Sequence, residues 1–329
     1  MATYVLDSSN TARLPRGPLA VSLTTSDAGV HARITARSES GAAVPSVPNG
    51  AHMVILPSIT ELTTVGAVPA AGLDRFAPNT ILHLSMTPEG ALGRGGDTAS
   101  LAPRDVSGLA FVDLATVAPE PDGALQITTL LDVEDVPLPP VAHAARIATR
   151  GVLGVDHVRA SSEVSVRCII DLSTSMSPAF DQRAVAACAD IVAGLSAVIS
   201  GQTTVDWLAT LPGSTEYTRV GLAELSARAG DPPTAGLGLA ADLVPGLSAP
   251  VAGPTLTVVI TDGPVPAVVT PNSHVVGLVV ATGAAAAHDA AVCLLQGDDT
   301  QARLADDAPA VTAIVTDLIR SARGKGLLA

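Results

Sequence analysis

The chain has 329 residues, enough for two domains that each bury a hydrophobic core. It is 47% hydrophobic but only 2% aromatic, so Ala, Val, Leu and Ile must supply the cores. A net charge of −13, with no cluster of Lys and Arg, argues against nucleic acid and anionic membrane surfaces as partners.

Residues 1–155 contain short apolar runs separated by Gly and Pro, a pattern that predicts a β-rich, sandwich-like domain. The runs are LAVSLTT (19–25), VHARITA (30–36), HMVIL (52–56), TILHLSM (80–86), GLAFVDL (108–114) and LQITTLL (125–131). The acidic stretch at 130–140 is interpreted as a solvated strand end leading into a proline-rich loop. Residues 150–162 are the expected connection between two domains.

Residues 163–329 alternate between strand-like runs and stretches of helical period. The predicted strands are 164–170, 203–208, 256–261, 275–281 and 291–296. Helices are expected at about 183–199, 218–229 and 235–244 and at the C-terminal end. This alternation predicts an α/β domain with a doubly wound, mostly parallel sheet.

Other patterns exclude several classes of protein. The seven histidines and three cysteines lack zinc-ligand spacing, and the cysteines fit small buried hydrophobes. There is no phosphate-binding loop and no G-x-S-x-G sequence, so neither an ATPase nor a hydrolase is expected. No signal peptide is evident, and Pro and Gly interrupt the uncharged span 243–261, so we expect a cytoplasmic protein without membrane insertion.

Two acidic residues follow predicted strands of the second domain. Asp171 begins the sequence DLSTSM (171–176), and Asp262 lies in TVVITDGP (257–264). Ligands bind outside the carboxyl ends of the strands in a doubly wound sheet, so both carboxylates are expected to face one crevice.

These two sequences, with their order and spacing, resemble the von Willebrand factor A (VWA) family. DLSTSM is similar to the D-x-S-x-S motif of its metal-ion-dependent adhesion site (MIDAS), and TVVITDGP to its later strand ending in Thr-Asp-Gly. The resemblance implies Mg²⁺ or Mn²⁺, with Ser173 and Ser175 binding the ion and Asp171 and Asp262 holding it or its waters. An open position on the ion would accept an Asp or Glu carboxylate from a protein partner.

The third ligand of that family corresponds best to Thr234, with Thr218 as a possible substitute. The sequence departs from the family at two places, with Thr174 where Gly is usual and Pro232-Pro233 where the family commonly has Gly-Gly. The alternative interpretation is that the hydroxyls of residues 173–175 cap a helix beginning near Pro178, and that Asp262 forms a simple turn.

The first domain is similar, more weakly, to the TerD-like tellurium-resistance and stress-response family. The similarity lies in LPRGPLAVSL (14–23) and in the region from GGDTAS to ALQITTLLD (95–132). Asp97, Asp105 and Asp113 match positions of that family's calcium-binding loop. Three acids fall short of the six to eight oxygens that Ca²⁺ takes, so a calcium site is not expected.

Together these resemblances imply a bacterial, non-enzymatic protein that binds protein partners through a divalent cation. The implied setting is a tellurium-resistance or stress-response system. The alternative is an accessory VWA subunit of an enzyme assembly such as an AAA+ ATPase or a metal chelatase. No ATPase-like domain or long acidic linker precedes the second domain, which argues against the chelatase.

Overall fold

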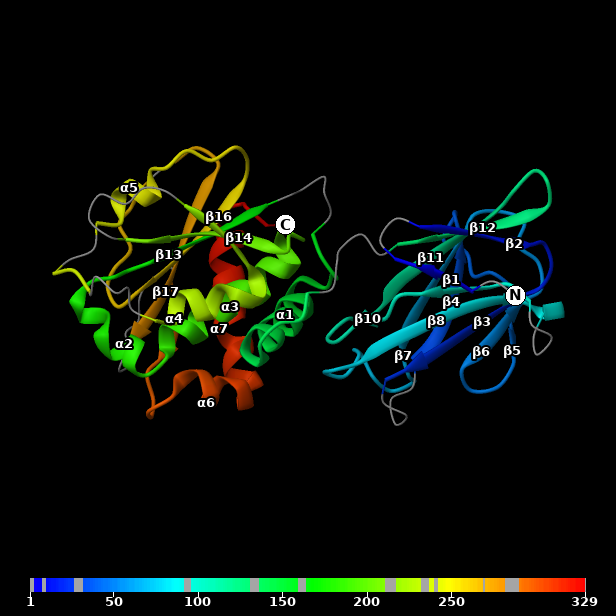
Figure 1. Ribbon diagram of the computed structural model, residues 1–329, viewed down its shortest axis with the longest axis horizontal. Coiled ribbons are helices and arrows are strands. Elements are labelled where there is room, and N and C mark those ends of the chain that lie inside the picture. The colour runs from blue at the N-terminus through cyan, green and yellow to red at the C-terminus, as the bar shows by residue number, and fades with distance from the viewer. Residues whose placement is uncertain are drawn as a thin grey trace. The chain divides into compact units, whose positions relative to one another are not determined.

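The computed structural model describes residues 3–7, 10–26, 32–91, 96–130, 136–158, 164–210, 217–231, 237–239, 242–268, 270–281 and 290–328. The chain is mixed α/β and divides into two compact units, residues 1–135 and 136–329 (Figure 1). Each unit has a hydrophobic core of its own.

The first unit contains two β-sheets. One consists, in spatial order, of β1 (Thr3–Leu6), β9 (Thr98–Leu101), β8 (Ile81–Pro88), β3 (Leu19–Thr25), β6 (Met53–Leu56) and β5 (Val47–Pro48), with β10 (Arg104–Asp105) paired to β8. The other consists of β2 (Thr11–Pro15), β12 (Ala124–Thr129), β11 (Val112–Pro119), β7 (Thr63–Pro69) and β4 (Ala32–Ser38). A 3₁₀ turn, η1 (Glu89–Ala91), follows β8.

Side chains alternate between buried and more exposed along several strands of this unit, among them β2, β8, β9 and β12. In β8, Leu82 and Leu84 are buried, whereas Ile81 and His83 are exposed. Buried residues of both sheets belong to one hydrophobic core. The two sheets therefore enclose that core, in the sandwich-like arrangement that the alternating runs predict.

The second unit is built on one six-stranded sheet. Its spatial order is β15 (Thr218–Gly221), β14 (Thr204–Ala209), β13 (Ser165–Ile170), β16 (Thr255–Thr261), β17 (Ser273–Ala281) and β18 (Ala290–Leu294). Neighbouring strands are parallel except β14 and β15, which are antiparallel. The chain builds the sheet outward from β13, first to one side and then to the other.

Most of the described helices of this unit lie together on one face of the sheet (Figure 1). They are α1 (Pro140–Leu153), α3 (Ala184–Ile199), α4 (Leu225–Gly230), α6 (Thr300–Asp306) and α7 (Ala308–Gly324). Helix α3 contacts β13, β16 and β17, and the other four helices pack against it. The opposite face is covered, within the described residues, by α5 (Val244–Leu247) and irregular segments over a smaller apolar cluster.

The structure places the division between the two units earlier than the predicted boundary at residue 155. Residues 140–153 form helix α1, which extends from the end of the predicted proline-rich loop (130–140) into the predicted connection (150–162). Pro140 is at the start of this helix, a position that suits its fixed φ and its missing N–H. Val141, Ala142 and Ala145 are buried in the core of the second unit, so this segment belongs there.

Two predicted helices also differ from the structure. At residues 218–229 the chain first forms β15, then a 3₁₀ turn, η4 (Leu222–Glu224), and only then α4. Over 235–244, described residues 237–239 are not helical and α5 begins at Val244, while 235–236 and 240–241 lie outside the described residues. The β-branched Thr218 and Val220 favour the strand that pairs with β14.

In the described part of the chain, no single helix has the length and apolar character needed to cross a membrane. A bent pair formed by residues 174–181 and 184–199 meets that test by length and composition alone.

Candidate functional site

The candidate site lies at the carboxyl ends of three neighbouring strands. Asp171 follows β13, Thr210 follows β14, and Asp262 follows β16. Because β13 is the strand from which the sheet extends in both directions, its carboxyl end is the place where sheets of this kind bind ligands. The strand order therefore brings residues that are far apart in the sequence to one edge.

Asp171 is buried, and protein groups hold both of its carboxylate oxygens. The backbone N–H of Ser173 donates to Oδ1 at 2.8 Å, and the hydroxyl of Thr261 donates to Oδ2 at 2.7 Å. Its own N–H donates to the carbonyl of Ile260 in β16 at 2.9 Å. Each carboxylate oxygen keeps a further lone pair, so Asp171 can still accept from a bound water or bind an ion.

The hydroxyls of Ser173 and Ser175 lie next to each other, with their Oγ atoms 3.0 Å apart. Ser173 is at the N-cap of the 3₁₀ turn η3 (Thr174–Met176), and the following helix is α2 (Ser177–Asp181). Neither element has a side-chain hydrogen bond at its cap. The helix-cap interpretation of these serines is therefore wrong, and their hydroxyls are paired with each other instead.

Thr174 does not need the conformational freedom of the glycine usual at this position in the VWA family. It is not among the described non-glycine residues with positive φ. Its N–H and its hydroxyl both donate to the carbonyl of Gly238, each at 2.7 Å. The loop after β13 is thereby joined to Gly238 in the segment 237–239.

The remaining predicted ligands have no described hydrogen bond to Asp171, Ser173 or Ser175. Asp262 is exposed, and its carboxylate makes no hydrogen bond within the described part of the chain. Thr234 lies outside the described residues. Thr218 is exposed at the start of β15, where it pairs with Trp207 of β14. The structure thus brings together Asp171, Ser173 and Ser175 and places Asp262 on the neighbouring strand end.

Two buried threonines take part in the site although neither is a predicted ligand. The hydroxyl of Thr210 donates to the carbonyl of Ile170 at 3.0 Å and accepts the N–H of Leu172 at 3.2 Å, so it fixes the backbone on both sides of Asp171. Thr261 binds the Asp171 carboxylate directly. Thr261 is the first residue of the Thr-Asp-Gly sequence, whereas the only signal for Thr210 is its position at a strand end.

The oxygen donors of the site fit a hard divalent cation. Mg²⁺ takes six oxygens at about 2.1 Å in octahedral geometry, so two adjacent ligands lie about 3.0 Å apart. The two serine hydroxyls have that separation without any change of rotamer. With carboxylates on two adjacent strand ends and no sulfur or imidazole contributed by the described residues, this donor set suits Mg²⁺ or Mn²⁺.

Asp97, Asp105 and Asp113 of the first unit are distributed over different parts of it. Asp105 is in β10 of one sheet, where its Oδ1 accepts the N–H of Ser107 at 2.9 Å. Asp113 is in β11 of the other sheet and pairs with Arg37 at 2.5 Å, and Asp97 precedes β9. Among the residues that the structure describes, no three His, Cys, Asp or Glu side chains gather in a way that could hold a metal ion.

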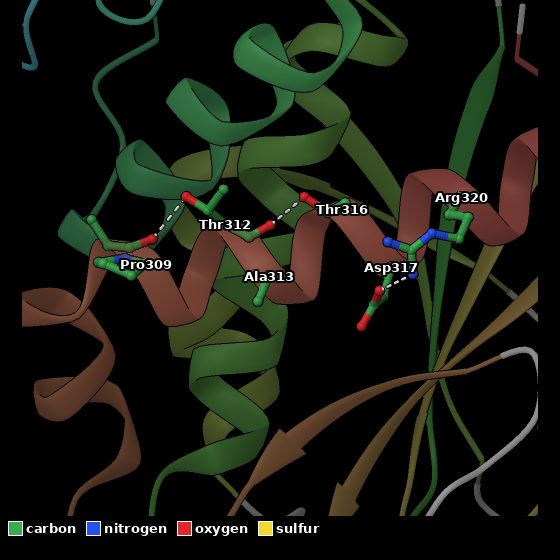
Figure 2. A pocket seen from close by; sticks show the side chains of 7 residues that line it. Pro309, Thr312, Ala313, Thr316, Asp317 and Arg320 are labelled. Carbon is green, nitrogen blue, oxygen red and sulfur yellow. Dashed lines mark hydrogen bonds and ion pairs between the residues drawn. The ribbon is translucent and has the colours of Figure 1, made fainter.

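A shallow hollow elsewhere in the second unit follows the outer side of α7 (Figure 2). Thr312 and Thr316 lie along it, but their hydroxyls donate to the helix's own carbonyls at 2.8 and 2.7 Å. Asp317 and Arg320 are paired with each other. None of the predicted ligands lines this hollow, and its polar groups are already bonded within the helix.

No protein family, no curated protein and no solved structure matches this chain. The function is therefore inferred from the residues and the geometry of the site.

Proposed function

We propose that the second unit is a doubly wound VWA domain whose MIDAS binds Mg²⁺ or Mn²⁺ and, through the ion, a carboxylate of a protein partner. The spatial strand order supports this, since the parallel strands extend to both sides of β13 and an antiparallel strand, β15, forms one edge. In this proposal Ser173 and Ser175 bind the ion directly. Asp171, Asp262 and Thr234 complete the site.

One observation carries the proposal. The two serine hydroxyls lie 3.0 Å apart and cap no helix, and the backbone N–H of Ser173 is bonded to the buried Asp171 carboxylate. Buried or half-buried hydroxyls commonly satisfy a nearby backbone group, and Ser and Thr after a strand commonly cap the next helix. These two hydroxyls have a separation that adjacent metal ligands also have, and their loop is bonded to a buried carboxylate, which together support a cation site.

The charge of the chain supports a partner that is recognised through the ion. The chain carries a net charge of −13, so an acidic side chain of a partner would be repelled at long range in the absence of a cation. A bound cation supplies the missing positive charge and an electrophilic position for that carboxylate. The protein's part is to hold the ion, and no bond of the partner needs to be made or broken.

Metal binding is tested with Mn²⁺, by calorimetry and by the electron paramagnetic resonance signal of the free ion. We expect one bound ion per chain, and a loss of at least roughly 100-fold in affinity in the Asp171→Ala/Ser173→Ala double variant, because ligands matter more than their supporting groups. Ser196→Ala is the matched control for the serine, because Ser196 and Ser200 form another hydroxyl pair, 3.1 Å apart, on α3. Equal affinity in the double variant and the wild type would refute the assignment.

The partner is tested by affinity purification from native cells with and without EDTA. We expect a protein that is released by EDTA and that the double variant does not retain. If that protein is an ATPase, the chain is an accessory subunit of an enzyme assembly, since the same site would serve either role. A partner retained equally by the wild type, by the double variant and in EDTA would show that binding does not use this site.

For the first unit we propose, on the resemblance of its sequence, a TerD-like domain in a bacterial tellurium-resistance or stress-response system. Its two sheets with a shared core are compatible with that proposal. We propose no calcium site there, because Asp105 and Asp113 lie in different sheets and each already has a protein partner.

A further inference from the structure

Thr261 joins the two strand-end turns of the candidate site. It is the last residue of β16, and its side chain is buried. Its hydroxyl donates to Oδ2 of Asp171 at 2.7 Å and accepts the N–H of Gly263 at 3.1 Å. A hydroxyl has one proton and two lone pairs, so one threonine can make both bonds at the same time.

The bond from Thr261 completes the restraint on the Asp171 carboxylate. The N–H of Ser173 holds Oδ1 from the loop that contains both serines, while Thr261 holds Oδ2 from the neighbouring strand. Rotation of the carboxylate about its Cβ–Cγ bond would break both hydrogen bonds. The plane of this charged group is therefore fixed by two independent elements.

The other threonines of β16 show that this arrangement is particular to Thr261. Thr255 donates to the backbone carbonyl of Gly253 at 2.9 Å, and Thr257 pairs with the hydroxyl of Ser273 at 3.2 Å. Both satisfy neutral neighbours, as buried hydroxyls in strands ordinarily do. Only Thr261 among the three is bonded to a carboxylate that we assign to the metal site.

We propose that Thr261 is a positioning residue, which orients the Asp171 carboxylate and couples the turn at Gly263 to the loop of Ser173 and Ser175. This inference rests on the proposed function. Outer groups that hydrogen bond to a ligand orient it, and their loss typically weakens metal binding by roughly 10- to 100-fold. Thr261 would act through Asp171 and would not touch the ion.

The experiment compares Thr261→Val, which has the same shape without the hydroxyl, with Thr261→Ser, which keeps it. Thr257→Val is the matched control, because it removes a buried hydroxyl from the same strand and the same face. In EDTA, hydrogen exchange of the Ser173 and Gly263 amides is measured by NMR on the full chain. Mn²⁺ affinity is then measured for each variant.

In EDTA we expect Thr261→Val to speed exchange of both amides by roughly tenfold, because Gly263 loses its acceptor and Asp171 is no longer held. Thr261→Ser and Thr257→Val should stay close to the wild type. Unchanged exchange at Ser173 in Thr261→Val would overturn the coupling. A similar acceleration in Thr257→Val would also overturn it, because the effect would then come from general loosening of the strand.

In Mn²⁺ we expect Thr261→Val to lose roughly 10- to 100-fold in affinity and Thr261→Ser to restore it. Undiminished affinity in Thr261→Val would overturn the positioning role even if the exchange data showed the coupling. A wild type that binds no Mn²⁺ would refute the metal site itself and the positioning role with it. The exchange data in EDTA would still decide separately whether Thr261 couples the two turns.

Discussion

Asp190 is a carboxyl group without solvent exposure on helix α3. Gln301 of α6 donates to its Oδ2 at 2.6 Å, and Arg183 in turn donates to the side-chain oxygen of Gln301 at 3.0 and 2.7 Å. Burial raises the pKa of Asp190 above 3.8, and the bonds from Gln301 and Ser226 and the charge of Arg183 oppose that rise only in part. The folded protein therefore binds this proton more tightly than the unfolded chain does.

This raised pKa makes Asp190 costly to the folded state at neutral pH. Below the unfolded value near 3.8 the carboxyl is protonated in both states, and its ionisation costs nothing. As the pH rises through the higher pKa of the folded state, stability is lost. We expect Asp190→Asn to be more stable than the wild type by about 1 kcal/mol at pH 7, with the difference disappearing toward pH 3.

Urea unfolding of both proteins between pH 3 and pH 8 measures that difference. Asp298→Asn is the control, because Asp298 is an exposed acid just before α6. A stability difference between Asp190→Asn and the wild type that does not change with pH would contradict the prediction.

At the residue scale, the sequence indicates the predicted ligands of the candidate site. It does not indicate the residues whose hydrogen bonds hold those ligands in place. Asp171, Ser173 and Ser175 follow from alternate spacing after an apolar run, and Asp262 from its place after a second run. The supporting roles of Thr210 and Thr261 do not follow from the sequence, although Thr261 precedes Asp262 in the Thr-Asp-Gly sequence, because a threonine at the end of a strand is an ordinary β-former. Only the pairing of β13 with β14 and β16 shows which groups their hydroxyls reach.

At the scale of elements, buried parallel strands were the most predictable part of the second unit. The predicted runs at 164–170, 203–208, 256–261, 275–281 and 291–296 correspond to β13, β14, β16, β17 and β18 within one or two residues at each end. Most of these runs are short, rich in β-branched residues and bounded by turn residues, which distinguishes buried parallel strands from buried helices. Helix α1 was not predicted from the sequence, because Pro139 and Pro140 indicate a loop. A proline at the first position of a helix is nevertheless favourable.

The contact between α1 and α3 depends on a glycine. A Cβ at Gly194 would lie 2.1 Å from the carbonyl oxygen of Ala142 and 2.7 Å from the Cβ of Ala145. We expect Gly194→Ala to destabilise the protein by about 1–3 kcal/mol, because two helix backbones would have to move apart. Thermal and urea unfolding measure the change.

Gly151→Ala is the matched control for that prediction. Gly151 is on α1 itself, and a Cβ there would meet nothing within 4 Å. In this variant the usual preference of helices for alanine over glycine should dominate. We expect the free energy of unfolding to rise by about 0.5–1 kcal/mol. A gain of similar size in Gly194→Ala would show that α1 does not pack closely on α3.

At the scale of the whole molecule, the position of α1 determines where the chain can be divided. Alternation and turn residues indicate two domains, but they place the boundary near residue 155, because Pro139 and Pro140 at the start of α1 indicate a loop. The apolar residues that α1 buries are small, with Val141 as the largest beside Ala142, Ala145 and Ala148. Such small side chains permit close helix contact.

The division after residue 135 predicts how fragments of the chain will fold. A fragment of residues 136–329 should unfold cooperatively, whereas 163–329 lacks α1 and exposes the face of α3 around Gly194. We expect the shorter fragment to be less stable by at least about 3 kcal/mol, the contribution expected from the apolar area that α1 buries. In the reciprocal comparison, extending 1–135 to 1–155 should add no stability, because α1 would have no partner there. Equal urea midpoints for 136–329 and 163–329 would mean that α1 is dispensable to the second unit, and a higher midpoint for 1–155 would assign it to the first.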